Sequence, residues 1–312
     1  MRIYPAIAFA ALVTAGPAHA ACTPLPQEKI GFQLYNMLAA MIPKAQMPAA
    51  VAGGPVTISQ ATLDRVFARM HAIGFRNMEG LGDRLPAPLA AYQSLLTKDG
   101  LNQIGSHRPL DATRWNAILD EAAALGQKDI GAPGFGEPGI ASLKDTLATA
   151  ANLNRFGATA AAKGLRLYVH NHDEEIKTKY LYDIAHDGHP RLVSAWEIVA
   201  ANTDPRFVHF EVDVHWTRIG FGLDHFADVL AFLRAHRDRI ALLHVKDTTA
   251  DGRITDVGKG TTDWPSVFAA AGPQIRYYIW EYDDDPDPFA SAAIAYRYLS
   301  CAKSPVFDYG RR

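Results

Sequence analysis

The sequence predicts a single-domain α/β protein, a (β/α)8 or TIM barrel, and three observations carry this prediction. Short apolar, β-rich runs alternate with segments of helical periodicity, and there are eight such runs. The centres of the first and last runs, near Leu34 and Ile279, lie 245 residues apart. Seven intervals over this distance average about 35 residues, the length of one βα unit.

The eight runs are four to six residues long, and most end in polar residues: 31–35, 75–79, 100–105, 128–131, 165–170, 208–213, 240–244 and 277–281. Helical periodicity is clearest in four of the segments between them: 61–73, 111–125, 143–163 and 225–235. A doubly wound open sheet is the competing fold. It usually has fewer strands, and no Gly-rich phosphate loop follows the first run. The barrel is therefore favoured.

The composition is that of an ordinary globular protein. Hydrophobic residues make up 48% of the chain and charged residues 21%, so it has enough apolar side chains for a full core. The formal net charge of −2 shows no basic excess that would mark a nucleic-acid or anionic-membrane partner, and we expect neither.

The first 20 residues are typical of a cleavable secretory signal peptide. Arg2 supplies the positive charge, a short apolar run follows, and residues 18–20 form a small-x-small cleavage site. The run is too short for a membrane anchor. His19 stands where a lipoprotein signal needs Leu, which counts against lipidation of Cys22. We expect export to the periplasm or the medium, and a barrel domain formed by residues 21–312.

The two cysteines, Cys22 and Cys301, lie near opposite ends of the exported chain. An oxidising compartment permits a disulfide between them, and a closed barrel brings its ends together. Two unrelated thiols are the alternative, and the sequence leaves both open.

Four consecutive runs place metal-binding residue types at the same rim, because barrel sites lie at the carboxyl ends of the strands. These residues are His170, Asp213, His244 and Glu281. Any one of them has an ordinary structural explanation, such as a helix cap for Asp213. Residues with separate structural roles would not need to stand at the same end of four consecutive strands. The set therefore predicts a divalent metal site. Mixed imidazole and carboxylate ligands favour Mn²⁺, Zn²⁺ or Co²⁺ over Mg²⁺.

Several longer motifs resemble the xylose isomerase-like TIM-barrel family, also called the sugar phosphate isomerase/epimerase superfamily. The resemblance covers nearly all of the exported chain and is most specific in its second half. The matching segments are 74–80, 106–107, 168–175, 210–216, 242–247, 257–264 and 280–283.

This resemblance implies a single rim metal, with Asp213, His244 and Glu281 as three of its ligands. The fourth is open, because many members have Glu at the end of the fifth strand where this chain has His170. Either His170 ligates, or Glu175 reaches back to do so.

The resemblance also implies residues for substrate. Lys246 is similar to the family's lysine that binds a substrate oxygen, and His172 is expected to be the base, with Glu175 as a further catalytic candidate. The sugar-contact candidates are His107, Glu79 and Trp216, although Trp216 serves equally well as a core residue at the barrel top.

Such a site suits proton abstraction next to a carbonyl through an enediolate. The first hypothesis is a metal-dependent sugar isomerase or epimerase acting on a small carbohydrate. The second is a lyase of the same family, acting on a 3-keto-glycoside or a keto-inositol, which export and the His-Asn-His variant favour. A non-catalytic carbohydrate-binding barrel is the third. An endonuclease IV-like repair enzyme is disfavoured by the net charge. The sequence leaves monomer and homodimer both open.

Overall fold

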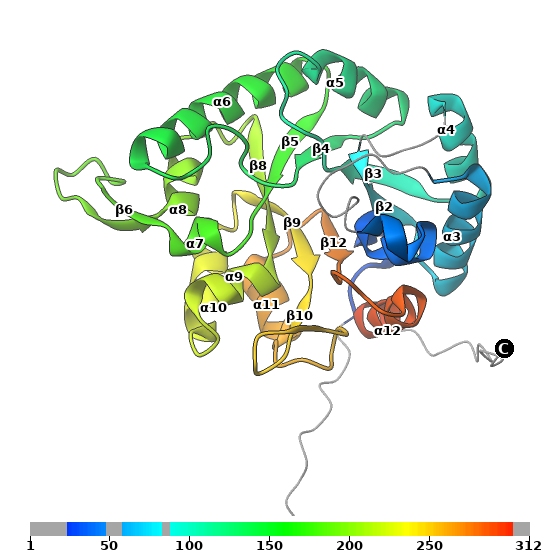
Figure 1. Ribbon diagram of the computed structural model, residues 1–312. Helices are drawn as coiled ribbons and strands as arrows, with labels where there is room; N and C mark the ends of the chain where they lie inside the picture. The colour runs from blue at the N-terminus through cyan, green and yellow to red at the C-terminus, as the bar shows by residue number, and fades with distance from the viewer. Residues whose placement is uncertain (1–23, 48–57, 83–87, 302–312) are drawn as a thin grey trace, which may run out of the picture.

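Eight parallel strands form one sheet at the centre of the computed structural model, which describes residues 24–47, 58–82 and 88–301 (Figure 1). Along the sheet the strands run in the order β3-β2-β1-β12-β9-β8-β5-β4. Their bounds are β1 Ile30–Gln33, β2 Asn77–Gly80, β3 Asn102–Ser106, β4 Asp129–Ala132, β5 Arg166–His170, β8 Val208–Asp213, β9 Ile240–Val245 and β12 Tyr277–Trp280.

The sheet closes on itself where β3 meets β4. His107, directly after β3, forms a parallel bridge with Gly131 in β4, and the backbone N–H of Arg108 donates to the carbonyl of Gly131 at 2.8 Å. The predicted barrel is therefore confirmed, and all eight runs form barrel strands whose ends differ from the predicted ones by at most two residues.

Helices surround the strands and pack their apolar faces inward (Figure 1). In α3 the buried residues Leu63, Val66, Phe67 and Met70 recur at helical spacing, and Ser59 caps the first turn. The helices are α1 Leu38–Met41, α3 Gln60–Ile73, α4 Leu89–Lys98, α5 Trp115–Ala124, α6 Leu143–Ala162, α7 Glu174–Lys177, α8 Ala195–Ala201, α9 Val214–Phe221, α10 Phe226–His236, α11 Trp264–Ala271 and α12 Pro288–Ser300.

Tyr168 fills the barrel interior beside two glycines. Its side chain is fully buried, and its hydroxyl donates to Glu79 on β2. A Cβ atom at Gly131 would lie well under 3.0 Å from the Tyr168 ring, and one at Gly105 would lie 2.6 Å from its hydroxyl. Glycine at these positions on β3 and β4 therefore makes room for the ring.

Two hairpins extend the loops at the carboxyl ends of the strands, and the sequence did not predict them. β6 (Lys179–Tyr182) and β7 (Arg191–Ser194) follow α7 and project from the barrel (Figure 1). β10 (Asp247–Thr248) and β11 (Ile254–Thr255) follow β9. The Asp247 carboxylate accepts hydrogen bonds from four backbone N–H groups and from the Trp264 indole, which fastens this second loop to the rim.

The two ends of the described chain meet beside the barrel. The N–H of Leu25 donates to the carbonyl of Leu299 at 2.8 Å. Cys301 is disulfide-bonded, and Cys22, the chain's other cysteine, lies outside the described residues, as does the expected signal peptide 1–20. Within the described residues, no helix has both the length and the apolarity that a membrane crossing needs.

Candidate active site

The four rim residues predicted as metal ligands come together as the sequence suggests. β5, β8, β9 and β12 are neighbours in the sheet, and their register sets Asp213 beside His244. His170, Asp213, His244 and Glu281 are all buried, and each offers a ligand atom within 4.8 Å of the others. Glu175 belongs to neither of the two groups in the described chain that could hold a metal.

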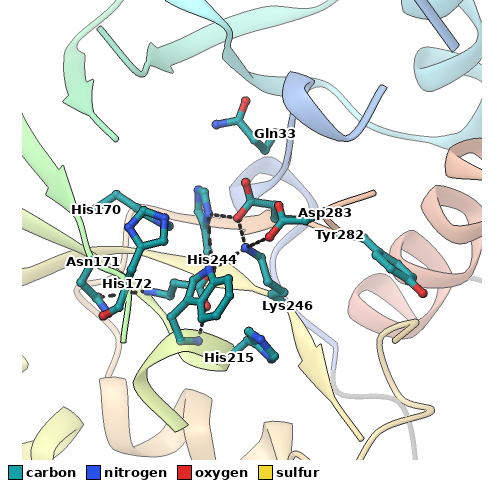
Figure 2. Close-up of polar contacts among 12 residues, drawn as sticks. Gln33, His170, Asn171, His172, His215, His244, Lys246, Tyr282 and Asp283 are labelled. Carbon is teal, nitrogen blue, oxygen red and sulfur yellow. Dashed lines mark hydrogen bonds and ion pairs between the residues drawn. The ribbon is translucent and has the colours of Figure 1, made fainter. Parts of the chain in front are cut away.

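Lys246 lies among the carboxylates of this rim group (Figure 2). Its Nζ is 2.7 Å from Glu281 Oε2, 2.8 Å from Asp283 Oδ2 and 3.1 Å from Asp213 Oδ2. Burial alone would lower the pKa of Lys246, but the three carboxylates hold it well above its usual value. The side chain is therefore a buried ammonium ion, 5.4 Å from the centre of the Trp216 ring.

Asp213 has two structural partners as well as its place in the rim group. Its Oδ1 accepts a hydrogen bond from the N–H of Trp216 at 2.8 Å and caps α9. Its Oδ2 faces Lys246. The helix-cap role that the sequence offered as an alternative for Asp213 is therefore present.

A second layer of polar side chains lies in the barrel interior and is centred on Glu79. This carboxylate is completely buried; it accepts hydrogen bonds from Tyr168 and from Gln33 Nε2 at 2.6 Å, and its Oε2 lies 2.9 Å from His244 Nε2. The Glu79 oxygens contact Gln33, Tyr168, His244 and His107, so a sugar contact of Glu79 stays a prediction.

Glu211 is the functional candidate that the sequence did not single out. Its Oε2 lies 2.8 Å from His107 Nε2, 3.2 Å from His244 Nε2 and 3.3 Å from His170 Nδ1. These four residues form the second group that could hold a metal. Glu211 and Asp213 are two positions apart on β8, so their side chains lie on the same face of the strand. This spacing could have identified Glu211 as a site candidate from the sequence. His107, expected at the sugar, points to this interior cluster.

His172 and Trp216 stand at the mouth of the barrel. The His172 ring is exposed, with its centre 4.9 Å from that of His170 and 5.8 Å from that of Trp216. Glu175 is buried beneath it, where its Oε2 accepts the backbone N–H of His172 at 2.9 Å. Glu175 therefore holds the turn that carries His172.

The donor atoms fit a divalent metal. Among the described residues, Glu211 Oε1 and His170 Nδ1 are buried and take part in no hydrogen bond, whereas Asp213 Oδ2 pairs with the Lys246 ammonium at 3.1 Å. Buried carboxylates without such partners are costly unless a cation compensates them. The cluster can thus hold a metal.

Comparison with known proteins identifies the family and the fold. Residues 67–299 match the family model described as xylose isomerase-like TIM barrel. Inosose dehydratase from Lactiplantibacillus plantarum is 29% identical over 171 residues, 47% of this chain and 51% of that protein. The chain therefore matches about half the length of this curated relative.

Solved structures show the same fold at low identity. A sugar phosphate isomerase/epimerase from Parabacteroides distasonis superposes with a TM-score of 0.65 at 21% identity, covering 92% of this chain and 99% of that one. A 3-keto-D-glucoside 4-epimerase from E. coli gives 0.57 at 19% identity, covering 88% and 99%.

Proposed function

Because the chain belongs to the xylose isomerase-like TIM-barrel family, we propose that it is a divalent-metal-dependent sugar isomerase or epimerase. The observation that carries the proposal is the buried cluster of imidazoles and carboxylates, in which Glu211 Oε1 and His170 Nδ1 have no hydrogen-bond partner. A bound metal would polarise a carbonyl and a neighbouring hydroxyl of the substrate, which makes the C–H bond between them more acidic. Mixed nitrogen and oxygen ligands favour Mn²⁺, Zn²⁺ or Co²⁺.

The chain's own groups divide the remaining work. His172 is the proposed base, since its exposed ring reaches the mouth and Glu175 fixes its backbone. Lys246 is the proposed donor to a substrate oxygen or to an enediolate, since three carboxylates around its Nζ keep it charged. The face of Trp216, half-buried at the mouth, suits stacking against a sugar ring.

A lyase is the second candidate, favoured by the similarity to inosose dehydratase. The same proton abstraction leads to elimination when the carbon next to the carbanion carries a leaving group. A keto-inositol or a 3-keto-glycoside would then lose water or its aglycone. We further propose that the protein works outside the cytoplasm, on the basis of its first 20 residues.

The test is metal analysis of the purified protein together with two histidine variants. His244 belongs to both groups that could hold a metal, so His244→Ala should remove the metal. His189→Ala, at an exposed position in the loop between β6 and β7, is the matched control and should keep it. We expect about one transition metal per chain in the wild type and the control.

Free ketoses, keto-inositols and 3-keto-glycosides would then be supplied to the loaded protein. Interconversion without loss of a group indicates an isomerase or epimerase, whereas release of water or aglycone indicates a lyase. A wild type that takes up no metal under any loading condition, or a His244→Ala variant with full activity, would refute the proposal.

A further inference from the structure

We infer that the hairpin of β6 and β7 is an interface between two copies of this chain, which pair edge to edge along β6. The hairpin projects from the barrel as an arm (Figure 1), and its two strands form a sheet of their own. Pairing of two such arms gives one four-stranded antiparallel sheet with a two-fold axis at Leu181. The inference goes beyond the proposed function and does not depend on it.

The backbone ladder of the hairpin shows which groups of β6 point to its outer edge. Facing residues in an antiparallel ladder alternate between hydrogen-bonded and non-hydrogen-bonded pairs. The N–H of Ala195 donates to the carbonyl of Thr178 at 2.8 Å, and the register continues from this pair into the hairpin. The N–H and C=O groups of Tyr180 therefore face β7, whereas those of Lys179 and Leu181 point to the outer edge.

The outer edge of β7 is less suited to pairing than that of β6. By the same alternation, the N–H of Ser194 points away from β6, and it donates to Glu197 Oε2 at 3.1 Å in the capping box of α8. Pro190, which precedes β7, has no N–H to offer. An incoming strand would find donors missing at both ends of this edge, so we assign the second copy to β6.

Residues 179–183, Lys-Tyr-Leu-Tyr-Asp, complement themselves when two copies run antiparallel. With Leu181 opposite Leu181 of the partner subunit, Lys179 lies opposite Asp183 of the partner subunit, and the two-fold axis repeats this pair. Opposite charges at facing positions stabilise a ladder. A lysine on an edge strand normally discourages pairing, but here each lysine meets an aspartate. The Asp183 carboxylate accepts the N–H groups of Asp187 and Gly188, and its remaining lone pairs suit a lysine.

The outer face of the hairpin carries the apolar part of the interface. Leu181 is 69% exposed and Leu192 is 65% exposed, and they are the two exposed large hydrophobic residues of the described chain. They face each other in the register of the hairpin. Edge pairing extends this pair into a row of four leucines across the joint sheet. Leu181 then has a leucine on both sides and loses exposed apolar surface.

The opposite face of the hairpin is fastened to the barrel, which holds the edge of β6 in place. The Tyr180 hydroxyl donates to the carbonyl of Ile140 at 2.6 Å, and the Tyr182 hydroxyl donates to Asn202 Oδ1 at 3.0 Å. Little conformational freedom is then lost when a second copy binds. Two hairpins bury less surface than a standard interface, so we expect a dimer that dissociates on dilution.

Leu181→Arg and Leu192→Arg form a matched pair for the test. Both replace an exposed leucine on the same face of the hairpin, but only Leu181 lies at the two-fold axis. Sedimentation equilibrium of the purified protein measures the dissociation constant of the dimer. Leu181→Arg sets two arginines opposite each other and should weaken the dimer by at least about tenfold. Leu192→Arg should change the dissociation constant by less than about threefold.

Cysteine cross-linking gives a second readout, which reports the register of the two strands. Facing residues of a hydrogen-bonded antiparallel pair have Cα atoms about 5.5 Å apart, within the range of a disulfide. Under mild oxidation, Leu181→Cys should therefore form a covalent dimer. Leu192→Cys should not, because three strand spacings, roughly 14 Å, separate the two copies of this position in the joint sheet.

Three results would overturn the inference. They are a protein that stays monomeric up to about 1 mM, a dimer that Leu181→Arg leaves as tight as the wild type, and equal weakening by both arginine variants. Should Leu181→Arg fail to fold, Lys179→Glu replaces it, because it sets a like charge opposite Asp183 of the partner subunit. A dimer that takes up no metal would count against the proposed function and leave this inference standing.

Discussion

The substitution Gly131→Ala adds one methyl group to the barrel interior and so tests how tightly the interior is packed. In Gly131→Ala the new Cβ would lie well under 3.0 Å from Cζ and Cε2 of Tyr168. The ring cannot retreat freely, because Gly105 lies against its hydroxyl and the hydroxyl donates to Glu79. Overpacking costs about 1–3 kcal/mol, and a displaced hydrogen bond to a carboxylate about 1.5–3 kcal/mol. We expect the free energy of unfolding to fall by about 3 kcal/mol.

Gly134→Ala is the matched control, since a Cβ there meets nothing within 4 Å. It should be neutral within about 0.5 kcal/mol, or slightly stabilising. Urea unfolding of the metal-free proteins compares the two variants at neutral pH. In a Tyr168→Val background, Gly131→Ala should lose most of its effect, because the ring is gone. A loss below about 1 kcal/mol in Gly131→Ala, or equal losses in both backgrounds, would refute this account of the two glycines.

Two further predictions concern the outer parts of the fold. Burial alone would raise the pKa of Glu197, but the nearby His236 imidazole and hydrogen bonds from Ser194 lower it to about 2. The contribution of Glu197 to stability is therefore present above pH 4.5 and is lost as the pH falls towards 2. Acid titration of stability should show a loss of about 1–2 kcal/mol, after allowance for solvent screening, that is missing in Glu197→Gln. For the disulfide at Cys301, reductant or Cys301→Ser should lower stability by about 2–4 kcal/mol. Thermal unfolding with and without reductant checks this, and equal melting temperatures would contradict it.

The barrel could be predicted because its strands carry a local signal. The clearest run is apolar enough to be buried on both faces: in β9 all six residues are buried. The hairpin of β6 and β7 carries no such signal. Lys179–Tyr182 alternates exposed and half-buried residues, and its partner strand exposes Leu192, which pairs with the equally exposed Leu181.

The site was only partly predictable for a different reason. Residues at strand ends could be placed on one rim from chain order alone, which brought His170, Asp213, His244 and Glu281 together. How deep a side chain lies within the barrel depends on the register between neighbouring strands. The spacing of residues along the sequence does not give this register. The contact of His107 with Glu211 joins residues 104 positions apart, and it turns an expected sugar contact towards the interior cluster.

The position of Trp216 gives the protein its own optical reporter. Of the five tryptophans, Trp115, Trp196, Trp264 and Trp280 are buried, and only Trp216 is partly open to solvent. Its ring lies over the Lys246 ammonium and beside His172. Aqueous quenchers should therefore act mainly on the fluorescence of Trp216, at the mouth of the barrel where the proposed substrate would bind. If the proposed substrate binds beside Trp216, its binding should change this emission, so it can be followed without a label and without turnover.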